Sequence, residues 1–241
     1  MAGVLRPFLL YGWRISVPVA LIWLMWVQLA PQDRAAFVQL DVQRLNVMEA
    51  DGKPRVIISN RSQMPNAYWK GKEYAHRSHG GGGFLFFNDD GSEAGGMGFA
   101  SGRDGNNRYA TSNLNFDQYE QDNTLQLIYR EANGKRSAGV QVNDRPNESI
   151  FPALEIVDRM SRTQDEAERA ALQAQLDTIA ARYKEETAVR FFAGKESGDS
   201  IVRLQDSRGR PRLLLKVDAA GAASIEFLDE SGAVVQRIPA Q

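Results

Sequence analysis

The chain opens with one long apolar run and then changes to short alternating segments separated by polar turns. The run covers residues 15–30 (ISVPVALIWLMWVQLA) and contains no charged side chain. A helix needs about 20 apolar residues to cross the hydrocarbon core of a bilayer. Tyr11 and Trp13 extend the apolar character toward that length, beyond Arg14. We therefore predict a transmembrane helix within an N-terminal segment of residues 1–44.

Two other interpretations of this run remain open. Arg6 and Arg14 ahead of an apolar stretch are typical of a cleaved signal peptide, although the bulky side chains and the absence of an A-x-A site argue against cleavage. The run is also compatible with a buried helix of a soluble domain. Lys and Arg are nearly balanced on its two sides. The short N-terminal tail then favours a single-pass topology with a cytoplasmic N terminus and an extracytoplasmic C-terminal domain.

After the run, the pattern is that of antiparallel β-strands. Residues 55–59 are a β-branched run, and residues 124–142 alternate on both sides of Asn133 and Gly134, a strong signal for a two-residue hairpin turn. Several strands of this kind predict a mainly β domain over residues 45–241. We expect an antiparallel β-meander that closes as a barrel or packs as a sandwich.

Two distant stretches share one pattern. VMEADGKPRVIIS (47–59) resembles LQDSRGRPRLLLK (204–216), and each is followed by a second match, FFNDDG in one case and FLDESG in the other. Because the matches occur in the same order, they predict an internal duplication, with units of about residues 45–99 and 202–237.

One amphipathic helix is predicted at about residues 163–186. Four apolar residues from Leu172 to Tyr183 recur at intervals of three and four, which places them on one face. Thr163 is the expected N-cap. We expect this helix to lie over the β core, with a partner-binding helix as the alternative.

The connection at residues 60–83 is much longer than its counterpart in the second unit, and loops of more than about 12–15 residues are often functional. It carries both histidines of the chain. A solvated loop packed by its own aromatic residues is the alternative interpretation. Our weak ligand-site candidates are His76, His79, Asp89, Asp90 and Glu93. Our partner-docking candidates are Trp23, Trp26, Tyr68 and Trp69.

Composition and motifs restrict the kinds of binding and catalytic site that the chain could contain. The chain has no cysteine, which excludes disulfides and thiolate metal sites. Lys and Arg number 29 against 30 Asp and Glu, a net charge of −1, so no basic excess indicates nucleic-acid binding. The sequence has no GxSxG or GxxxxGK[ST] motif, and an HxxH pair in a polar loop is a weak metal signal. We therefore expect no catalytic residues, no cofactor and no metal site.

Several stretches together resemble a known family. FLFFNDDGSEAGG, LNFDQYEQD, GKRSAGVQVNDRP and the final GRPRLLLKVDAAG are similar to segments of a family of bacterial single-pass membrane-anchored, β-rich proteins. The resemblance implies one shared architecture from about Leu45 onward. It supplies no catalytic residues.

The anchor, the β domain without a catalytic set and the near-zero charge lead to one functional expectation. We expect a non-enzymatic accessory or structural subunit of a membrane protein complex, for example an energy-converting or photosynthetic one. Its partners would be membrane lipid and other integral membrane subunits, and not nucleic acid. The alternative is a membrane-anchored extracytoplasmic ligand-binding domain or hydrolase that uses residues 60–83.

Overall fold

The computed structural model describes residues 35–69 and 71–239. The chain divides into two units, residues 1–41 and residues 42–241. The described part of the first unit contains no helix or strand. The predicted transmembrane helix lies outside the described residues. None of the helices in the described part of the chain is both long enough and apolar enough to cross a bilayer.

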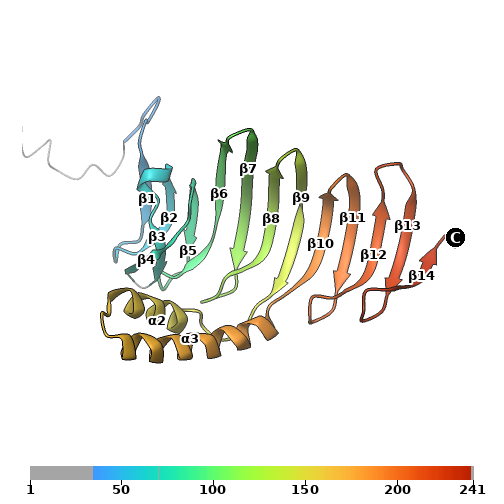
Figure 1. Cartoon of the computed structure of the whole chain (residues 1–241). Helices are drawn as coiled ribbons and strands as arrows, with labels where there is room; N and C mark the ends of the chain where they lie inside the picture. Colours follow the sequence, from blue (N-terminus) through green and yellow to red (C-terminus); the bar gives the residue numbers. More distant parts are fainter. Residues whose placement is uncertain (1–34, 70, 240–241) are drawn as a thin grey trace, which may run out of the picture. The chain divides into compact units, whose positions relative to one another are not determined.

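Twelve strands of the second unit form one antiparallel sheet (Figure 1). Apart from the step from β2 to β5, each strand pairs with the next strand of the chain, so the predicted mainly β, antiparallel meander is confirmed. In order across the sheet, the strands are β1 (Arg44–Met48), β2 (Pro54–Ser59), β5 (Gly82–Phe87), β6 (Glu93–Asp104), β7 (Asn107–Asp117), β8 (Asn123–Ala132), β9 (Lys135–Asp144), β10 (Ala188–Glu196), β11 (Asp199–Gln205), β12 (Pro211–Val217), β13 (Ala223–Leu228) and β14 (Val234–Ile238).

The described strands do not close into the expected barrel, nor do they divide into the two large sheets of a sandwich. They form one open sheet with β1 and β14 at its edges, and β3 and β4 pair separately as a small two-stranded sheet. A barrel requires the first and last strands to pair. Here ten strands separate them.

Turn chemistry explains why the strands follow one another as hairpins. Asn133 and Gly134 join β8 to β9 with φ values of 53° and 78°, as the sequence predicts for this hairpin. Longer turns use an aspartate at the first position. The Oδ1 of Asp218 accepts hydrogen bonds from the backbone N–H groups of Ala220 and Ala222, both at 2.9 Å. These local bonds satisfy the turn without help from the rest of the fold.

The two segments of the predicted duplication share a turn geometry. The backbone N–H of Glu49 donates to the carbonyl oxygen of Lys53 at 2.8 Å, and that of Asp206 donates to Arg210 at 3.0 Å. The first pair lies between β1 and β2, and the second lies between β11 and β12. This match agrees with the duplication, which stays a prediction.

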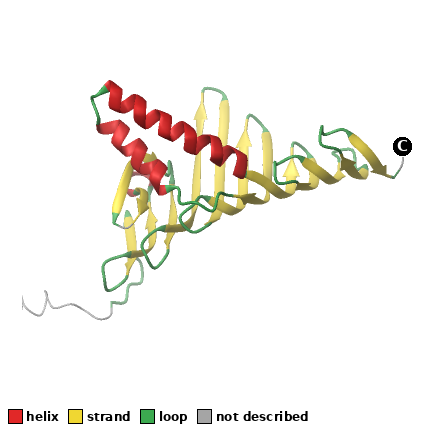
Figure 2. Ribbon diagram, turned by 90° about the horizontal axis from the view of Figure 1, so that it is seen from below, coloured by secondary structure: helices red, strands yellow, loops and turns green. Residues whose placement is uncertain are grey.

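Two insertions interrupt the meander and pack against each other. Ala67 and Tyr74 of the first insertion form one buried cluster with Phe151 and Leu154 of the second. The segment predicted to be a long loop is therefore mostly an ordered hairpin. The helices lie beside the N-terminal half of the sheet (Figure 2). The inserted elements are the 3-10 helix η1 (Arg61–Gln63), β3 (Asn66–Trp69), β4 (Lys72–Ser78), α2 (Phe151–Arg162) and α3 (Glu166–Glu186).

The helical insertion contains two helices where one was predicted. Thr163, the expected N-cap, is the C-cap of α2. The N-cap of α3 is Asp165, whose side chain accepts hydrogen bonds from the N–H groups of Ala167 and Glu168. Leu172 of the predicted apolar stripe is buried. The predicted helix is thus confirmed, and it ends where the sequence predicted. It begins at Glu166, three residues later than predicted.

The two faces of the large sheet differ in what they contact. We call the face toward β3, β4 and α2 the inner face. Several of its apolar side chains are buried, including Ile57 and Leu85 in the N-terminal half and Phe192 and Ile201 farther along. Met64 and Tyr68 of the first insertion pack on this face.

The opposite face, which we call the outer face, carries two apolar rows that run across all twelve strands. Apart from Gly95, no residue of these rows is buried by the described part of the chain. The first row is Leu45, Ile58, Phe84, Met97, Leu114, Leu127, Val140, Ala193, Val202, Leu215, Ile225 and Ile238. The second row is Val47, Val56, Phe86, Gly95, Phe116, Leu125, Val142, Phe191, Leu204, Leu213, Phe227 and Gln236.

Candidate functional site

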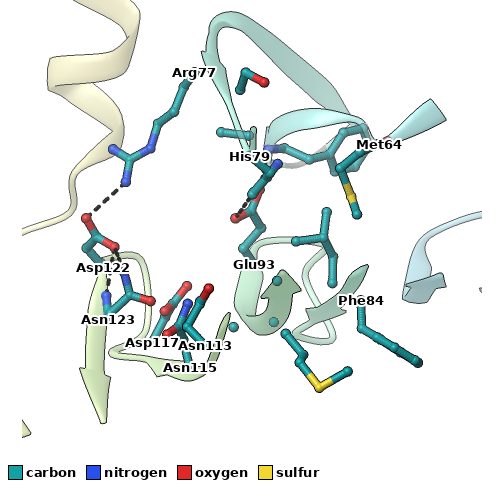
Figure 3. Close-up of a pocket in the computed structure, with 18 of the residues that line it drawn as sticks. Met64, Arg77, His79, Phe84, Glu93, Asn113, Asn115, Asp117, Asp122 and Asn123 are labelled. Carbon is teal, nitrogen blue, oxygen red and sulfur yellow. Dashed lines mark hydrogen bonds and ion pairs between the residues drawn. The ribbon is translucent and has the colours of Figure 1, made fainter. Parts of the chain in front are cut away.

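A cavity of about 260 Å³ lies between the inner face and the two insertions (Figure 3). Strands β5 to β7 form its floor, and residues of β3, β4 and α2 line its other sides. Gly96 and Gly98 leave room on the floor because they carry no side chain. A Cβ atom at Gly96 would lie 2.5 Å from the carbonyl oxygen of Phe84, so this position requires glycine.

Polar side chains of β7 project into this cavity. Asn113, Asn115 and Asp117 are two residues apart along the strand, which places all three on the inner face. Figure 3 shows them side by side at the base of the cavity. The Oδ1 of Asn115 accepts a hydrogen bond from the Nε2 of Gln126 at 3.2 Å. The floor therefore presents amide and carboxyl groups where a buried sheet would ordinarily present apolar groups.

Two ion pairs border the cavity. The Nε2 of His79 lies 3.2 Å from the Oε2 of Glu93, and its Nδ1 lies 2.8 Å from the carbonyl oxygen of Pro65. On the other side, the Nη2 of Arg77 lies 3.0 Å from the Oδ2 of Asp122. Both nitrogens of the imidazole are thus engaged by oxygen atoms of the protein.

The pKa shifts favour the charged form of both pairs. Burial lowers the pKa of His79, but the hydrogen bond and charge of Glu93 outweigh this effect and the pKa lies above its ordinary value. Burial raises the pKa of Asp122. The hydrogen bond from the backbone of Asn123 and the charge of Arg77 reverse this shift, so the pKa lies below its usual range.

Asp117 is the carboxyl group left without such a partner. Its Oδ1 is buried and has no hydrogen-bond partner among the described residues. Burial and the nearby charges of Asp122 and Glu93 raise its pKa to about 7, although Arg77 and Arg145 act in the opposite direction. The cavity therefore contains a carboxyl group that changes charge near neutral pH and lacks a hydrogen-bond donor.

The balance of charges indicates which ligands fit. Three carboxyl groups border the cavity, Glu93, Asp117 and Asp122, against the side chains of Arg77 and His79. With all five groups ionised, the lining carries a net charge of −1, and Arg145 acts on Asp117 from outside the lining. A cation that donates hydrogen bonds would offset this charge and supply the donor that Asp117 lacks. Among the described residues, no group of three or more His, Asp or Glu side chains is placed to hold a metal ion.

Of the five weak ligand-site candidates, only His79 and Glu93 meet at the cavity. His76 is exposed, and its ring packs edge-on against Tyr74. Asp89 and Asp90 lie in the turn between β5 and β6. There Asp89 forms an ion pair with a residue of β2, and Asp90 accepts a hydrogen bond from the turn after β7. The five residues do not form one site.

The partner-docking candidates have internal contacts where the structure describes them. Tyr68 packs against buried residues of the inner face. The ring of Trp69 stacks on that of Phe151, with centroids 4.1 Å apart and an interplanar angle of 9°. These contacts attach the β3–β4 hairpin to the sheet and to α2. Trp23 and Trp26 lie outside the described residues.

The acceptors of the cavity floor were missed from the sequence, although a signal was present. In NLNFD, polar residues occupy every second position of a strand from Asn113 to Asp117. Such alternation places polar groups on one face and apolar groups on the other. The glycines around Gly96 fit no phosphate-loop pattern. Their actual role is to leave space above the floor.

Comparisons with known proteins add no family. The chain matches no protein-family model, and it matches no curated protein.

Proposed function

We propose that the protein is a non-enzymatic accessory subunit of a membrane assembly that binds a small ligand with an ammonium group in the cavity. Residues 15–30 would anchor it in the bilayer, and the sheet domain would hold the ligand outside the cytoplasm. The observation that carries the ligand proposal is the buried Oδ1 of Asp117, which has no hydrogen-bond donor among the described residues.

An ammonium group suits this cavity for three reasons. It has only donors, and the cavity offers it the unpaired carboxylate oxygen of Asp117. Its charge offsets the excess carboxylate. Its desolvation is compensated by a charge-assisted hydrogen bond to Asp117. A volume of about 260 Å³ admits a ligand on the order of ten non-hydrogen atoms, since one water molecule occupies about 30 Å³.

The contacts of His79 and Glu93 favour a positioning role for these two residues over proton transfer. A general base needs a free nitrogen or oxygen within reach of its proton, and both nitrogens of His79 already face protein oxygens. Glu93 is likewise engaged, because its Oε1 accepts a hydrogen bond from the backbone N–H of Tyr68 at 2.8 Å. These contacts support a rigid site that positions a ligand.

Calorimetric titration of the full chain in detergent at pH 8 tests the ligand proposal. The probes are n-butylammonium, n-butanol and butyrate, which share a carbon skeleton and differ in charge and donors. We expect heat of binding from the amine alone. Asp117→Asn should abolish this binding, whereas Asp177→Asn on α3, which does not line the cavity, should preserve it. Equal binding of the alcohol, or unchanged binding by Asp117→Asn, contradicts the proposal.

The affinity for the amine should also depend on pH. Asp117 must lose its proton to accept the cation, and its pKa is about 7. We therefore expect the affinity to rise from pH 6 to pH 8. Asp122, Glu93, Arg77 and Arg145 face this carboxyl and set the midpoint. A pH-independent affinity would show that Asp117 does not contact the amine.

The accessory role has a separate test. Purification in mild detergent from native membranes should yield the chain together with an integral membrane protein. A lone chain would contradict the accessory role and would leave the cavity proposal intact.

A further inference from the structure

We infer that the outer face of the sheet binds the outer face of a second copy of this chain. Apart from Gly95, the residues of the two apolar rows on this face are exposed or partly exposed from one edge of the sheet to the other. Leu127 is 55% exposed near the middle, Val47 is 50% exposed near one edge, and Ile238 is 48% exposed at the other edge. Exposed apolar surfaces of this extent mark interaction sites.

The area of the apolar rows matches that of a stable dimer. Twelve strands spaced by about 4.8 Å give a length of about 55 Å, and two rows give a width of about 14 Å. The product is roughly 750 Å² on each copy, close to the roughly 800 Å² per partner of a standard interface. A partner must therefore present an apolar surface about 55 Å long. A second copy of the chain presents such a surface because it carries the same outer face.

The shape and charge of the face also suit self-association. Two sheets with the same right-handed twist pack face to face with their strands about 30° apart and a separation of about 10 Å. Near the margins of the apolar rows, charges of both signs occur in pairs, such as Arg136 with Glu131 at 3.2 Å and Arg190 with Asp144. With a net charge of −1, two copies would not repel each other strongly.

The two halves of the outer face are complementary to each other. A hollow of about 580 Å³ lies on this face over β10 to β14, lined by apolar residues that include Val202 and Leu215. In the other half, Phe99 on β6 and Phe116 on β7 are 53% and 50% exposed. A two-fold axis parallel to the strands, between β8 and β9, places β6 and β7 of one copy over β11 and β10 of the other. Phe99 of one copy then faces the hollow of the other, and Phe116 faces Phe191 in the second row, as an isologous interface allows.

Single cysteines test this arrangement directly, because the chain contains none of its own. Leu127→Cys lies on the outer face of β8, next to the proposed axis. Arg130→Cys lies on the same strand and is also exposed, but on the inner face. The full chain is reconstituted in phosphatidylcholine vesicles and treated with bis-maleimidoethane, because sheets about 10 Å apart hold the two sulfur atoms beyond the reach of a disulfide. We expect a crosslinked dimer from Leu127→Cys and none from Arg130→Cys. No dimer from Leu127→Cys, or equal yields from both variants, overturns the inference.

A second pair of variants tests the same interface at another position, in case the change at residue 127 disturbs the structure locally. Val140→Cys on β9 should also crosslink, and adding Leu127→Lys should abolish this crosslink by placing a charge in the interface. Far-ultraviolet circular dichroism checks that the double variant remains folded. Persistence of the crosslink overturns the inference. So does a monomer in which Leu127→Cys is shielded from a water-soluble maleimide, because lipid or another segment would then cover the face. Neither result depends on ligand binding in the cavity.

Discussion

The N-terminal and C-terminal halves of the sheet are built from the same kind of hairpin, yet their inner faces differ. In the N-terminal half, the inner face carries Leu85 and Phe87, which are buried under the β3–β4 hairpin. In the C-terminal half, no described helix or hairpin lies over β11 to β14 (Figure 1). The inner face there carries charged residues, such as Glu226 paired with Arg237 at 2.7 Å. Charged side chains on the inner face are thus most frequent where no covering layer lies, although Ile201 and Leu214 are also on this face.

The outer face breaks this rule. It is apolar in both halves, although the described part of the chain covers neither of them. The polarity of the inner face is therefore explained within one copy, whereas that of the outer face requires an additional partner. This contrast is the reason for assigning the outer face to a second copy.

The same leucine-to-alanine change in the two halves should give the largest difference. Leu85 is 5% exposed in the covered half, whereas Leu214 on the inner face of β12 is only partly buried. We expect Leu85→Ala to lower the free energy of unfolding by about 3 kcal/mol and Leu214→Ala by about half as much. Chemical denaturation of both variants measures the difference. A larger loss at Leu214 would contradict the layered description.

Asp117 should make the covered half sensitive to pH. Its pKa of about 7 in the folded state lies above the ordinary value of 3.8, so the folded protein holds this proton more tightly than the unfolded chain does. Stability is therefore lost as the pH rises from about 4 to 7. The full shift corresponds to about 4 kcal/mol. Because part of the side chain reaches solvent, we expect about 2 kcal/mol.

Asp117→Asn removes this penalty, so it should stabilise the protein by about 2 kcal/mol at pH 8 and have little effect at pH 4. Thermal denaturation at both pH values measures it. The same substitution that abolishes amine binding would thus increase stability. Equal effects at the two pH values would show that the carboxyl group has an ordinary pKa.

The smallest effect is expected at a turn of the uncovered half. Asp218→Ala removes two hydrogen bonds to backbone N–H groups, and water can replace them because the turn is exposed. We expect a loss of about 1 kcal/mol. Asp177→Ala on the exposed face of α3 serves as the control, with a smaller loss. If Asp218→Ala costs as much as Leu85→Ala, the turn contributes more than its local hydrogen bonds.

Local signals predicted the local structure well. Asn133 and Gly134 identified the β8–β9 hairpin because only such residues adopt the required positive φ at low cost. The apolar stripe that includes Leu172 identified α3. Helix α2 was missed because it is a single short amphipathic segment directly after the polar stretch around Asn147.

Features that depend on distant contacts were not predictable in this way. Whether a meander closes or stays open depends on whether its edge strands meet, and no local pattern near β1 or β14 encodes this. The cavity floor was within reach of the sequence, since Asn113, Asn115 and Asp117 alternate. Their convergence with His79 and Glu93 required the fold of the β3–β4 hairpin, which the sequence suggested only as a long loop.

The central claim is that Asp117 presents an unpaired carboxyl group to an ammonium ligand. Carbon-13 NMR of aspartate-labelled full chain in detergent measures its pKa directly, with Asp117→Asn assigning the resonance. The account predicts a pKa of about 7 in the free protein and a clear decrease when n-butylammonium is added, with no change on adding n-butanol. A free-protein pKa near the ordinary value of about 4, or a pKa that the amine leaves unchanged, would contradict it.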